Sequence, residues 1–215
     1  MYITIIGTGY VGLVSGACFA ELGQTVECID IDAQKISLLQ QGKIPIYEPG
    51  LQELVNKNMR NDRLHFSTHM NQSVAKADVI FIAVGTPTNS KDGSANLEYV
   101  FKAVESMSPS LEGYTVIVTK STVPVNTCQQ IKKLVTNHNS NACFDIASNP
   151  EFLREGSAIE DFMKPDRIVL GVETSRSKAI LEKIYSPLQE EGTRIVITTP
   201  ETAELTKYAA NSFLA

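Results

Sequence analysis

The first dozen residues contain the feature that most limits the fold. An apolar run ending at Ile6 is followed by glycines with the spacing G-x-G-x-x-G, namely Gly7, Gly9 and Gly12. In a strand–turn–helix context, the first glycine permits the tight turn, the second lets the backbone approach a pyrophosphate, and the third lets the helix pack on the sheet. A helix starting near Tyr10 would point its free N–H groups at that anion. The sequence therefore predicts a dinucleotide site.

Short β-branched runs alternate with longer helical patterns along the chain. The runs predicted as strands are 2–6, 25–30, 79–83, 115–119, 144–147, 167–171 and 194–197, with a weaker one at 63–66. An apolar stripe of Val11, Val14, Cys18 and Leu22 predicts the first helix, and further helical patterns cover 127–135, 175–185 and 201–214. Several strands are apolar on both faces, which is typical of a covered parallel sheet. This order predicts a Rossmann-type, doubly wound, mostly parallel α/β sheet.

An acid follows the glycines at the distance expected for a ribose contact. Asp30 ends the second predicted strand, about 20 residues downstream, where a carboxylate can accept hydrogen bonds from both adenosine ribose hydroxyls. It would also repel a 2′-phosphate, which favours NAD over NADP. Lys35, one helical turn beyond Asp32, weakens that preference because it is a cation. We expect NAD as the cofactor.

Two threonines follow predicted strand ends, where loops of an open α/β sheet line the ligand crevice. Thr86 lies in the segment 84–88 and Thr122 in the segment 120–124. Ligand contact and ordinary helix capping by Ser or Thr explain these positions equally well.

Two pairs of polar residues are spaced four apart. Lys207 and Asn211 would share one helix face, where an ammonium and an amide can donate to a developing alkoxide. The alternative is that Lys207 and Asn211 are ordinary polar residues on a solvated helix face, and from the residues alone this alternative is the better supported. If the segment is helical, Glu151 and Glu155 would place two like charges on one helix face. The alternative is that both acids lie in the first turn of a helix, where the helix dipole favours negative charge.

Composition restricts the remaining functions. The net charge is −5 and no basic stripe occurs, which argues against nucleic acid or an anionic membrane as the main partner. No signal-peptide pattern or membrane-length apolar run is found. The cysteines are far apart and form no C-x-x-C pair, so we expect free thiols in a reducing cytosol and no metal site: Cys18, Cys28, Cys128 and Cys143.

Several segments, taken together, resemble the UDP-glucose/GDP-mannose dehydrogenase family, and most closely its UDP-glucose branch. In family order they are 7–12, 45–51, 84–88, 120–124, 149–156 and 207–215. The resemblance implies oxidation of the C6 alcohol of UDP-glucose to the acid with two NAD, through a cysteine thiohemiacetal and thioester. The cofactor would accept the hydrides, while the protein supplies position, charge and the nucleophile.

The resemblance also implies roles for individual residues. Besides the glycine turn and Tyr10, the residues implied to contact NAD are Val11, Asp30, Lys35, Thr86, Thr122 and Glu155. The loop implied to lie along the sugar nucleotide contains Phe152, Leu153, Arg154 and Glu155. Glu151 would be the general base for thioester hydrolysis. Lys207 and Asn211 would contact the sugar and stabilise the oxyanion, and Thr122 would help to place a water.

One part of the family pattern is missing. The nucleophilic cysteine of the family lies in a Cys-Phe-Pro-Lys-Asp-like motif that does not occur here, and no cysteine of this chain is a credible substitute. The last helical pattern also ends without a capping glycine or proline. We expect an NAD-binding domain at 1–198 and the start of a central linking helix at 199–215, with the remaining central and UDP-sugar-binding domains absent.

These expectations define the function predicted for the chain and its alternatives. The chain should bind NAD without turning over UDP-glucose, and the whole protein should be a cytoplasmic homodimer joined through the central helix. A GDP-mannose or UDP-N-acetylhexosamine 6-dehydrogenase and a non-catalytic NAD-binding module remain alternatives. Other 3-hydroxyacid-type dehydrogenases do not explain the Glu-Pro-Gly-Leu and Pro-Glu-Phe-Leu-Arg-Glu segments.

Overall fold

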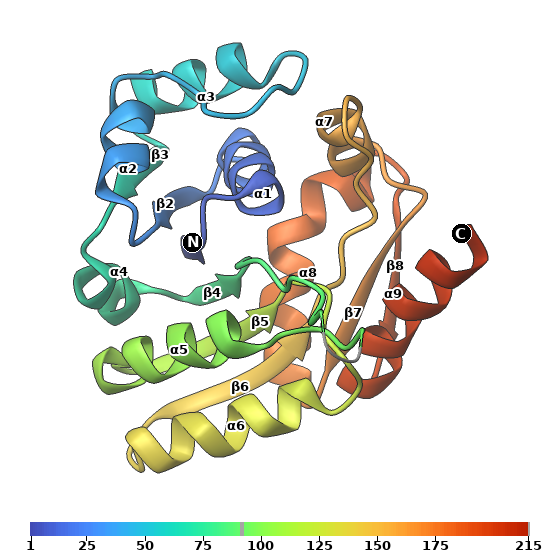
Figure 1. The fold of residues 1–215 in the computed structure, drawn as a ribbon. Coiled ribbons are helices and arrows are strands. Elements are labelled where there is room, and N and C mark those ends of the chain that lie inside the picture. The colour runs from blue at the N-terminus through green and yellow to red at the C-terminus, as the bar shows by residue number, and fades with distance from the viewer. Residues whose placement is uncertain (91–92, 215) are drawn as a thin grey trace.

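A twisted sheet of eight strands runs through the part of the chain that the computed structural model describes, residues 1–90 and 93–214 (Figure 1). The strand order is β3-β2-β1-β4-β5-β6-β7-β8. The strands are β1 (Tyr2–Ile6), β2 (Thr25–Ile29), β3 (Leu64–Ser67), β4 (Val79–Ile82), β5 (Tyr114–Thr119), β6 (Cys143–Ser148), β7 (Arg167–Val172) and β8 (Arg194–Thr198). All neighbours are parallel except β6 and β7. The predicted fold class is confirmed, and each predicted strand agrees with the structure to within one residue at either end.

Helices cover both faces of the sheet (Figure 1). Five share one face and its buried cluster: α1 (Tyr10–Glu21), α2 (Ala33–Gln40), α3 (Leu51–Arg60), α7 (Ala158–Met163) and α8 (Ser175–Glu190). The other face is covered by α4 (Met70–Lys76), α5 (Glu98–Met107), the 3₁₀ turn η1 (Ser108–Ser110) and α6 (Thr127–His138). A last helix, α9 (Pro200–Leu214), packs on β6 and β7. None of the described helices is long and apolar enough to cross a membrane.

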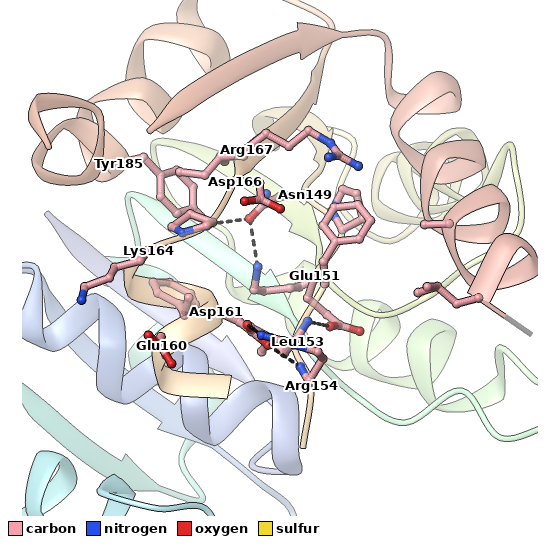
Figure 2. Close-up of a pocket in the computed structure, with 18 of the residues that line it drawn as sticks. Asn149, Glu151, Leu153, Arg154, Glu160, Asp161, Lys164, Asp166, Arg167 and Tyr185 are labelled. Carbon is pink, nitrogen blue, oxygen red and sulfur yellow. Dashed lines mark hydrogen bonds and ion pairs between the residues drawn. The ribbon is translucent and has the colours of Figure 1, made fainter. Parts of the chain in front are cut away.

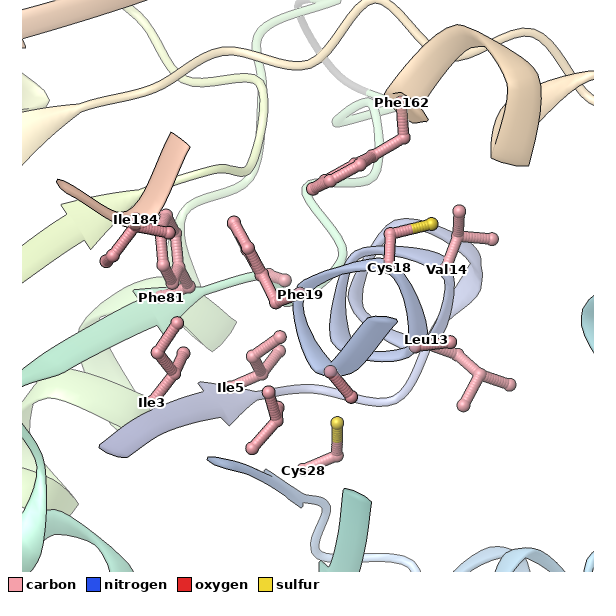
Figure 3. Close-up of a cluster of buried hydrophobic side chains, with 14 of the residues drawn as sticks. Ile3, Ile5, Leu13, Val14, Cys18, Phe19, Cys28, Phe81, Phe162 and Ile184 are labelled. Atoms are coloured by element: carbon pink, nitrogen blue, oxygen red, sulfur yellow. The ribbon is translucent and has the colours of Figure 1, made fainter. Parts of the chain in front are cut away.

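The prediction that α1 buries a single apolar stripe is wrong, because nearly the whole helix is buried. Every residue from Gly12 to Ala20 is buried, whereas Val11 and Leu22 are only partly buried. The ring of Phe19 stacks on Phe81 of β4, with ring centroids 4.8 Å apart, and meets the edge of Phe162 of α7 at 5.1 Å (Figure 3). A helix that is apolar all round is an interior helix. Contacts with β2, α3 and α7 surround α1, and its N-terminus follows β1 at the sheet edge.

Candidate functional site

The loops that carry the predicted site residues meet at one edge of the sheet. Strands β1, β2, β4, β5 and β6 are mutually parallel, so their carboxyl ends lie together. The residues that follow these strands include the glycine turn, Asp30, Thr86, Thr122 and Glu151. Ligands of open α/β sheets bind at such an edge, where neighbouring strands lead to opposite faces.

The three glycines of the turn have different surroundings. Gly7 has φ +103°, and a Cβ there would lie 2.6 Å from the carbonyl oxygen of Ala83. A Cβ on Gly12 would lie 2.0 Å from the oxygen of Gly7, so close backbone packing requires both glycines. A Cβ on Gly9, by contrast, would meet no protein atom within 4 Å. Since no side chain caps α1 in the described structure, the amides around Gly9 fit an anionic group that approaches from outside.

Asp30 is held firmly at the end of β2. Its Oδ2 atom accepts hydrogen bonds from the backbone N–H of Thr8 (2.9 Å) and the hydroxyl of the same threonine (2.6 Å), and its Oδ1 atom accepts from the backbone N–H of Asp32 (3.1 Å). Burial raises the pKa of Asp30, but the bonds from Thr8 and Asp32 outweigh this and hold the pKa below its ordinary value. The carboxylate is therefore charged at neutral pH and can accept further hydrogen bonds.

Lys35 neutralises this acid. Its Nζ lies 3.2 Å from Asp30 Oδ2, and the two side chains are 29% and 13% exposed. Since Oδ2 already accepts three hydrogen bonds, a ribose that engages both carboxylate oxygens would displace the Lys35 ammonium. The predicted ribose acid and the cation that weakens the NAD preference thus form one unit.

Thr86 and Thr122 join two neighbouring loops. The hydroxyl of Thr86 donates to the carbonyl oxygen of Thr122 at 2.9 Å, linking the loop after β4 to the loop after β5. Helix capping, one of the two interpretations of these threonines, is wrong, because the N-cap residues of α5 and α6 are Leu97 and Asn126. Both threonines instead hold the loops after β4 and β5 together at the carboxyl edge of the sheet.

The loop after β6 and helix α9 meet through an ion pair. Glu151 Oε1 lies 3.0 Å from Lys207 Nζ, and the side chains are 12% and 10% exposed. Glu151 Oε2 accepts from the backbone N–H of Leu153 at 2.7 Å, which turns the chain there. The conditional helix across Glu151 and Glu155 is therefore wrong. The solvated alternative is also wrong for Lys207, although Asn211, one turn further along α9, is exposed.

The predicted sugar-nucleotide loop continues from this pair. The ring of Phe152 lies between two cations, 5.3 Å from Lys207 Nζ and 5.6 Å from the guanidinium carbon of Arg167. Arg154 folds back on Asp161 of α7 through Nε (3.1 Å) and Nη2 (2.7 Å), as Figure 2 shows. Its side chain remains 76% exposed, so a ligand can reach it, and Glu155 is exposed beside it.

A cavity of about 720 Å³ opens between this loop, α7, α8 and α9 (Figure 2). Glu151, Phe152, Leu153 and Arg154 line it, together with Arg167 and the end of α9. The glycine turn is not among its lining residues, so the cavity is separate from the place where the pyrophosphate is expected. Its size is in the range of small-molecule sites.

Lys120 also lines this cavity and was not predicted as a site residue. It is 3% exposed, and its Nζ donates to Asn149 Oδ1 at 3.1 Å; the Tyr185 hydroxyl donates to the same oxygen at 2.5 Å (Figure 2). Burial lowers the pKa of Lys120 to about 8. The available signal was its position, since Lys120 directly follows β5 at the carboxyl edge.

The cysteines do not provide a nucleophile at this site. Cys18, Cys28 and Cys128 are buried, and burial raises the pKa of each thiol, that of Cys18 to about 12. Cys143 is exposed but begins β6, at the strand end opposite the site. Reactive cysteines have accessible thiolates, which the buried thiols do not provide.

These features together define a Rossmann-type dinucleotide-binding domain: a doubly wound sheet, a glycine turn opening onto α1, and an acid at the end of the neighbouring strand. The model of the UDP-glucose/GDP-mannose dehydrogenase family, NAD binding domain, matches residues 1–189, and the chain belongs to this family.

Similar proteins support this assignment. The UDP-glucose 6-dehydrogenase of Rhizobium meliloti is 51% identical over all of this chain and half of its own length. Among solved structures, a UDP-glucose dehydrogenase of Pyrobaculum islandicum has a TM-score of 0.94 at 40% identity, covering 99% of this chain and 49% of that one. A GDP-mannose dehydrogenase of Pseudomonas aeruginosa has a TM-score of 0.95 at 34% identity, covering all of this chain and 50% of that one. The chain thus spans about half the length of the relatives it matches.

Proposed function

We propose that this chain is the NAD-binding part of a UDP-glucose 6-dehydrogenase, which oxidises UDP-glucose to UDP-glucuronate with two NAD. The observation that carries this proposal is the Glu151–Lys207 ion pair, whose Glu151 side chain lines the cavity described above. A carboxylate and an ammonium at that place suit proton removal and oxyanion stabilisation, which both oxidation steps and the final hydrolysis require.

The residues present fit the cofactor. The N-terminus of α1 would hold the pyrophosphate, Asp30 would accept the adenosine ribose hydroxyls, and Thr86, Thr122 and Glu155 would contact the remainder. Bound NAD supplies the hydride acceptor. The negative charge of Asp30 disfavours a 2′-phosphate, and its ion pair with Lys35 moderates that effect without removing it.

The chain's own residues would orient the sugar and move protons. Phe152, Leu153 and Arg154 would lie along the sugar nucleotide, and Lys207 with Asn211 would donate to the oxygen that becomes negative. Glu151 would accept the proton of the hydrolytic water that Thr122 helps to place. The thiol that carries the thioester would come from a part of the protein outside this chain, because the cysteines described here are buried or at the wrong sheet edge.

The choice of sugar nucleotide depends on sequence and not on fold. The TM-scores against a UDP-glucose and a GDP-mannose dehydrogenase are 0.94 and 0.95, so the backbone does not separate these enzymes. Identity is 51% to a UDP-glucose 6-dehydrogenase and 34% to the GDP-mannose enzyme, which favours UDP-glucose. Enzymes for GDP-mannose or a UDP-N-acetylhexosamine are the second candidate.

We also propose the organisation of the whole protein. Residues 1–198 form the NAD-binding domain, 199–215 begin a central helix, and further central and UDP-sugar-binding domains complete the active site. The whole protein would be a cytoplasmic homodimer joined through that helix, and its product would serve acidic polysaccharide synthesis. Exposed apolar side chains near the end of α9, Phe213 (91%) and Leu214 (87%), fit burial against such further parts.

Calorimetry and an NADH assay test the proposal. This chain should bind NAD more tightly than NADP and should produce no NADH with UDP-glucose, whereas the full-length protein should produce two NADH per UDP-glucose. A folded chain that gives no heat of binding with NAD would overturn the cofactor site. Steady NADH production by this chain alone would overturn the division of the active site.

A further inference from the structure

Residues 45–51 carry a family motif that the proposed function does not use. This segment leads into α3, and two adjacent side chains differ strongly in exposure: Tyr47 is 88% exposed, whereas Glu48 is 6% exposed. A carboxylate is rarely buried to this degree without partners, because removing its charge from water is costly. The partners of Glu48 therefore indicate what the segment does.

The Glu48 carboxylate joins three distant parts of the chain. Its Oε1 atom accepts a hydrogen bond from the backbone N–H of Ala158 at 2.8 Å. Its Oε2 atom accepts from the backbone N–H of Gly156 at 2.8 Å and from the hydroxyl of Tyr10. Burial raises the pKa of Glu48, but the bonds from Tyr10, Gly156 and Ala158 outweigh this and hold the pKa below its usual range. The ionised Glu48 carboxylate and its hydrogen bonds to Tyr10, Gly156 and Ala158 are called the Glu48 lock below.

The positions of these partners connect the lock to both halves of the site. Tyr10 is the first residue of α1 and directly follows Gly9, where the pyrophosphate is proposed to bind. Gly156 and Ala158 close the loop 150–157, which contains the proposed sugar-nucleotide residues and Glu155. Helix α7 begins at Ala158, and its N-cap residue Ser157 makes no side-chain cap bond, so Glu48 takes over that function.

We propose that Glu48 is a positioning residue that fixes the loop 150–157 against the N-terminus of α1, and so sets how the cofactor and the sugar nucleotide lie relative to each other. This inference rests on the proposed function, because it is the function that assigns Glu155 to NAD and Phe152, Leu153 and Arg154 to the sugar. The inference gives residues 45–51 a role in which they position the loop 150–157 and do not contact a ligand.

The proposal predicts a thermodynamic link between the lock and the cofactor. If NAD contacts the loop, ordering of the loop contributes to NAD affinity, and a loosened loop must be ordered again when NAD binds. Breaking the lock should therefore weaken NAD binding even though Glu48 does not touch the ligand. The same change should expose the amides of Gly156 and Ala158 to exchange while the strands stay protected.

The experiment compares four variants of this chain. Glu48→Ala removes every acceptor, Glu48→Gln keeps one carbonyl-type acceptor, and Tyr10→Phe removes only the hydroxyl donor. Glu53→Gln is the matched control, because it neutralises an exposed acid in the first turn of α3. Each is measured by amide hydrogen exchange, by calorimetry with NAD, and by denaturant unfolding, which identifies variants with a global loss of stability.

The expected result is a graded series. Glu48→Ala should raise the NAD dissociation constant about tenfold and speed exchange at Gly156 and Ala158 by at least that factor, as for one lost charge-assisted hydrogen bond. Glu48→Gln and Tyr10→Phe should lie between Glu48→Ala and the wild type, and Glu53→Gln should match the wild type. If Glu48→Ala fails to fold, Glu48→Gln still tests both NAD affinity and loop exchange, and Tyr10→Phe still tests loop exchange.

Two results would overturn the inference. The first is faster loop exchange with unchanged NAD affinity, since loop position would then not matter to the cofactor. The second is unchanged exchange of the Gly156 and Ala158 amides in folded Glu48 variants. A wild-type chain that binds no NAD is a different failure: it overturns the proposed function, and the exchange data still show whether Glu48 holds the loop.

Discussion

Lys207 of α9 and Glu151 of the loop after β6 form an ion pair of 3.0 Å between segments more than fifty residues apart in the chain. Both side chains are largely shielded from water, at 10% and 12% exposure. The pair attaches α9 to the carboxyl edge of the sheet and places a carboxylate next to an ammonium where the proposed chemistry needs both.

A double-mutant cycle measures the strength of this pair. Lys207→Met and Glu151→Gln should each lower the unfolding free energy by about 1–3 kcal/mol, because each leaves a shielded charge without its partner. The double variant should lose less than the sum of the two. The exposed pair Lys102–Glu98 (2.6 Å; 65% and 57% exposed) is the control and should couple by at most about 0.5 kcal/mol. Additive effects at 207 and 151 would contradict the finding.

The glycine turn offers a test that separates folding from binding. Gly12→Ala would place a Cβ 2.0 Å from the oxygen of Gly7, so it should destabilise the fold by several kcal/mol (about 3 or more). Gly9→Ala meets no protein atom within 4 Å and should fold nearly as well as the wild type. It should nevertheless lose NAD binding by at least about tenfold, because its methyl group occupies the approach to the pyrophosphate. Thermal unfolding and calorimetry give the two readouts. Normal NAD binding by Gly9→Ala would place the pyrophosphate elsewhere.

The ribose acid can be tested by removing its charge. Asp30→Asn should raise the NAD dissociation constant roughly 10- to 100-fold, the usual cost of losing hydrogen bonds to a charged group. It should also narrow the difference between NAD and NADP, since the repulsion of a 2′-phosphate is removed. Asp62→Asn is the control, because Asp62 is 94% exposed and asparagine tolerates its positive φ. Equal affinity of the Asp30→Asn variant and the wild type for NAD would contradict the assignment.

Lys120 predicts a particular pH dependence of stability. The pKa of Lys120 is lowered by burial from 10.5 to about 8, so the folded state binds fewer protons than the unfolded state between those values. Stability should therefore rise with pH across this window, by at most about 1.4 kcal/mol per pH unit from this group. Lys120→Met has no such titration, so the unfolding free energy of the wild type should rise relative to that of the variant from pH 7.5 to 10.5. Other titrating groups cancel in this difference. A constant difference would show that the Lys120 pKa is not lowered.

Much of the fold could be predicted from local sequence. Strands such as Val79–Ile82 are short, β-branched and apolar on both faces, and this pattern needs no information from distant residues. Helices α4 and α7 gave no comparable signal, since they have only seven and six residues and two buried positions each. The interior position of α1 was also missed, because a four-residue stripe suggests one buried face while α3 and α7 cover the others.

The site divides in the same way. Glycine spacing and the position of Asp30 predicted the dinucleotide half, because turn geometry and strand length are local properties. The chemical half depends on contacts between distant residues: Glu151 with Lys207, Thr86 with Thr122, and the Lys120–Asn149–Tyr185 group. No spacing rule indicates that Lys120 is buried, because burial depends on which helices cover it.

The sequence by itself determined the strands, the glycine turn and the acid that follows it, since each depends on the conformational preference of a few adjacent residues. Only the tertiary structure decided which charges face each other, as Glu48 illustrates. Its sequence neighbours are exposed or partly buried, and it becomes a lock only because α1 and the loop before α7 supply N–H and O–H donors from residues more than thirty positions away in either direction. Hydrogen bonds of this kind follow from the packing of whole elements, which local preference does not specify.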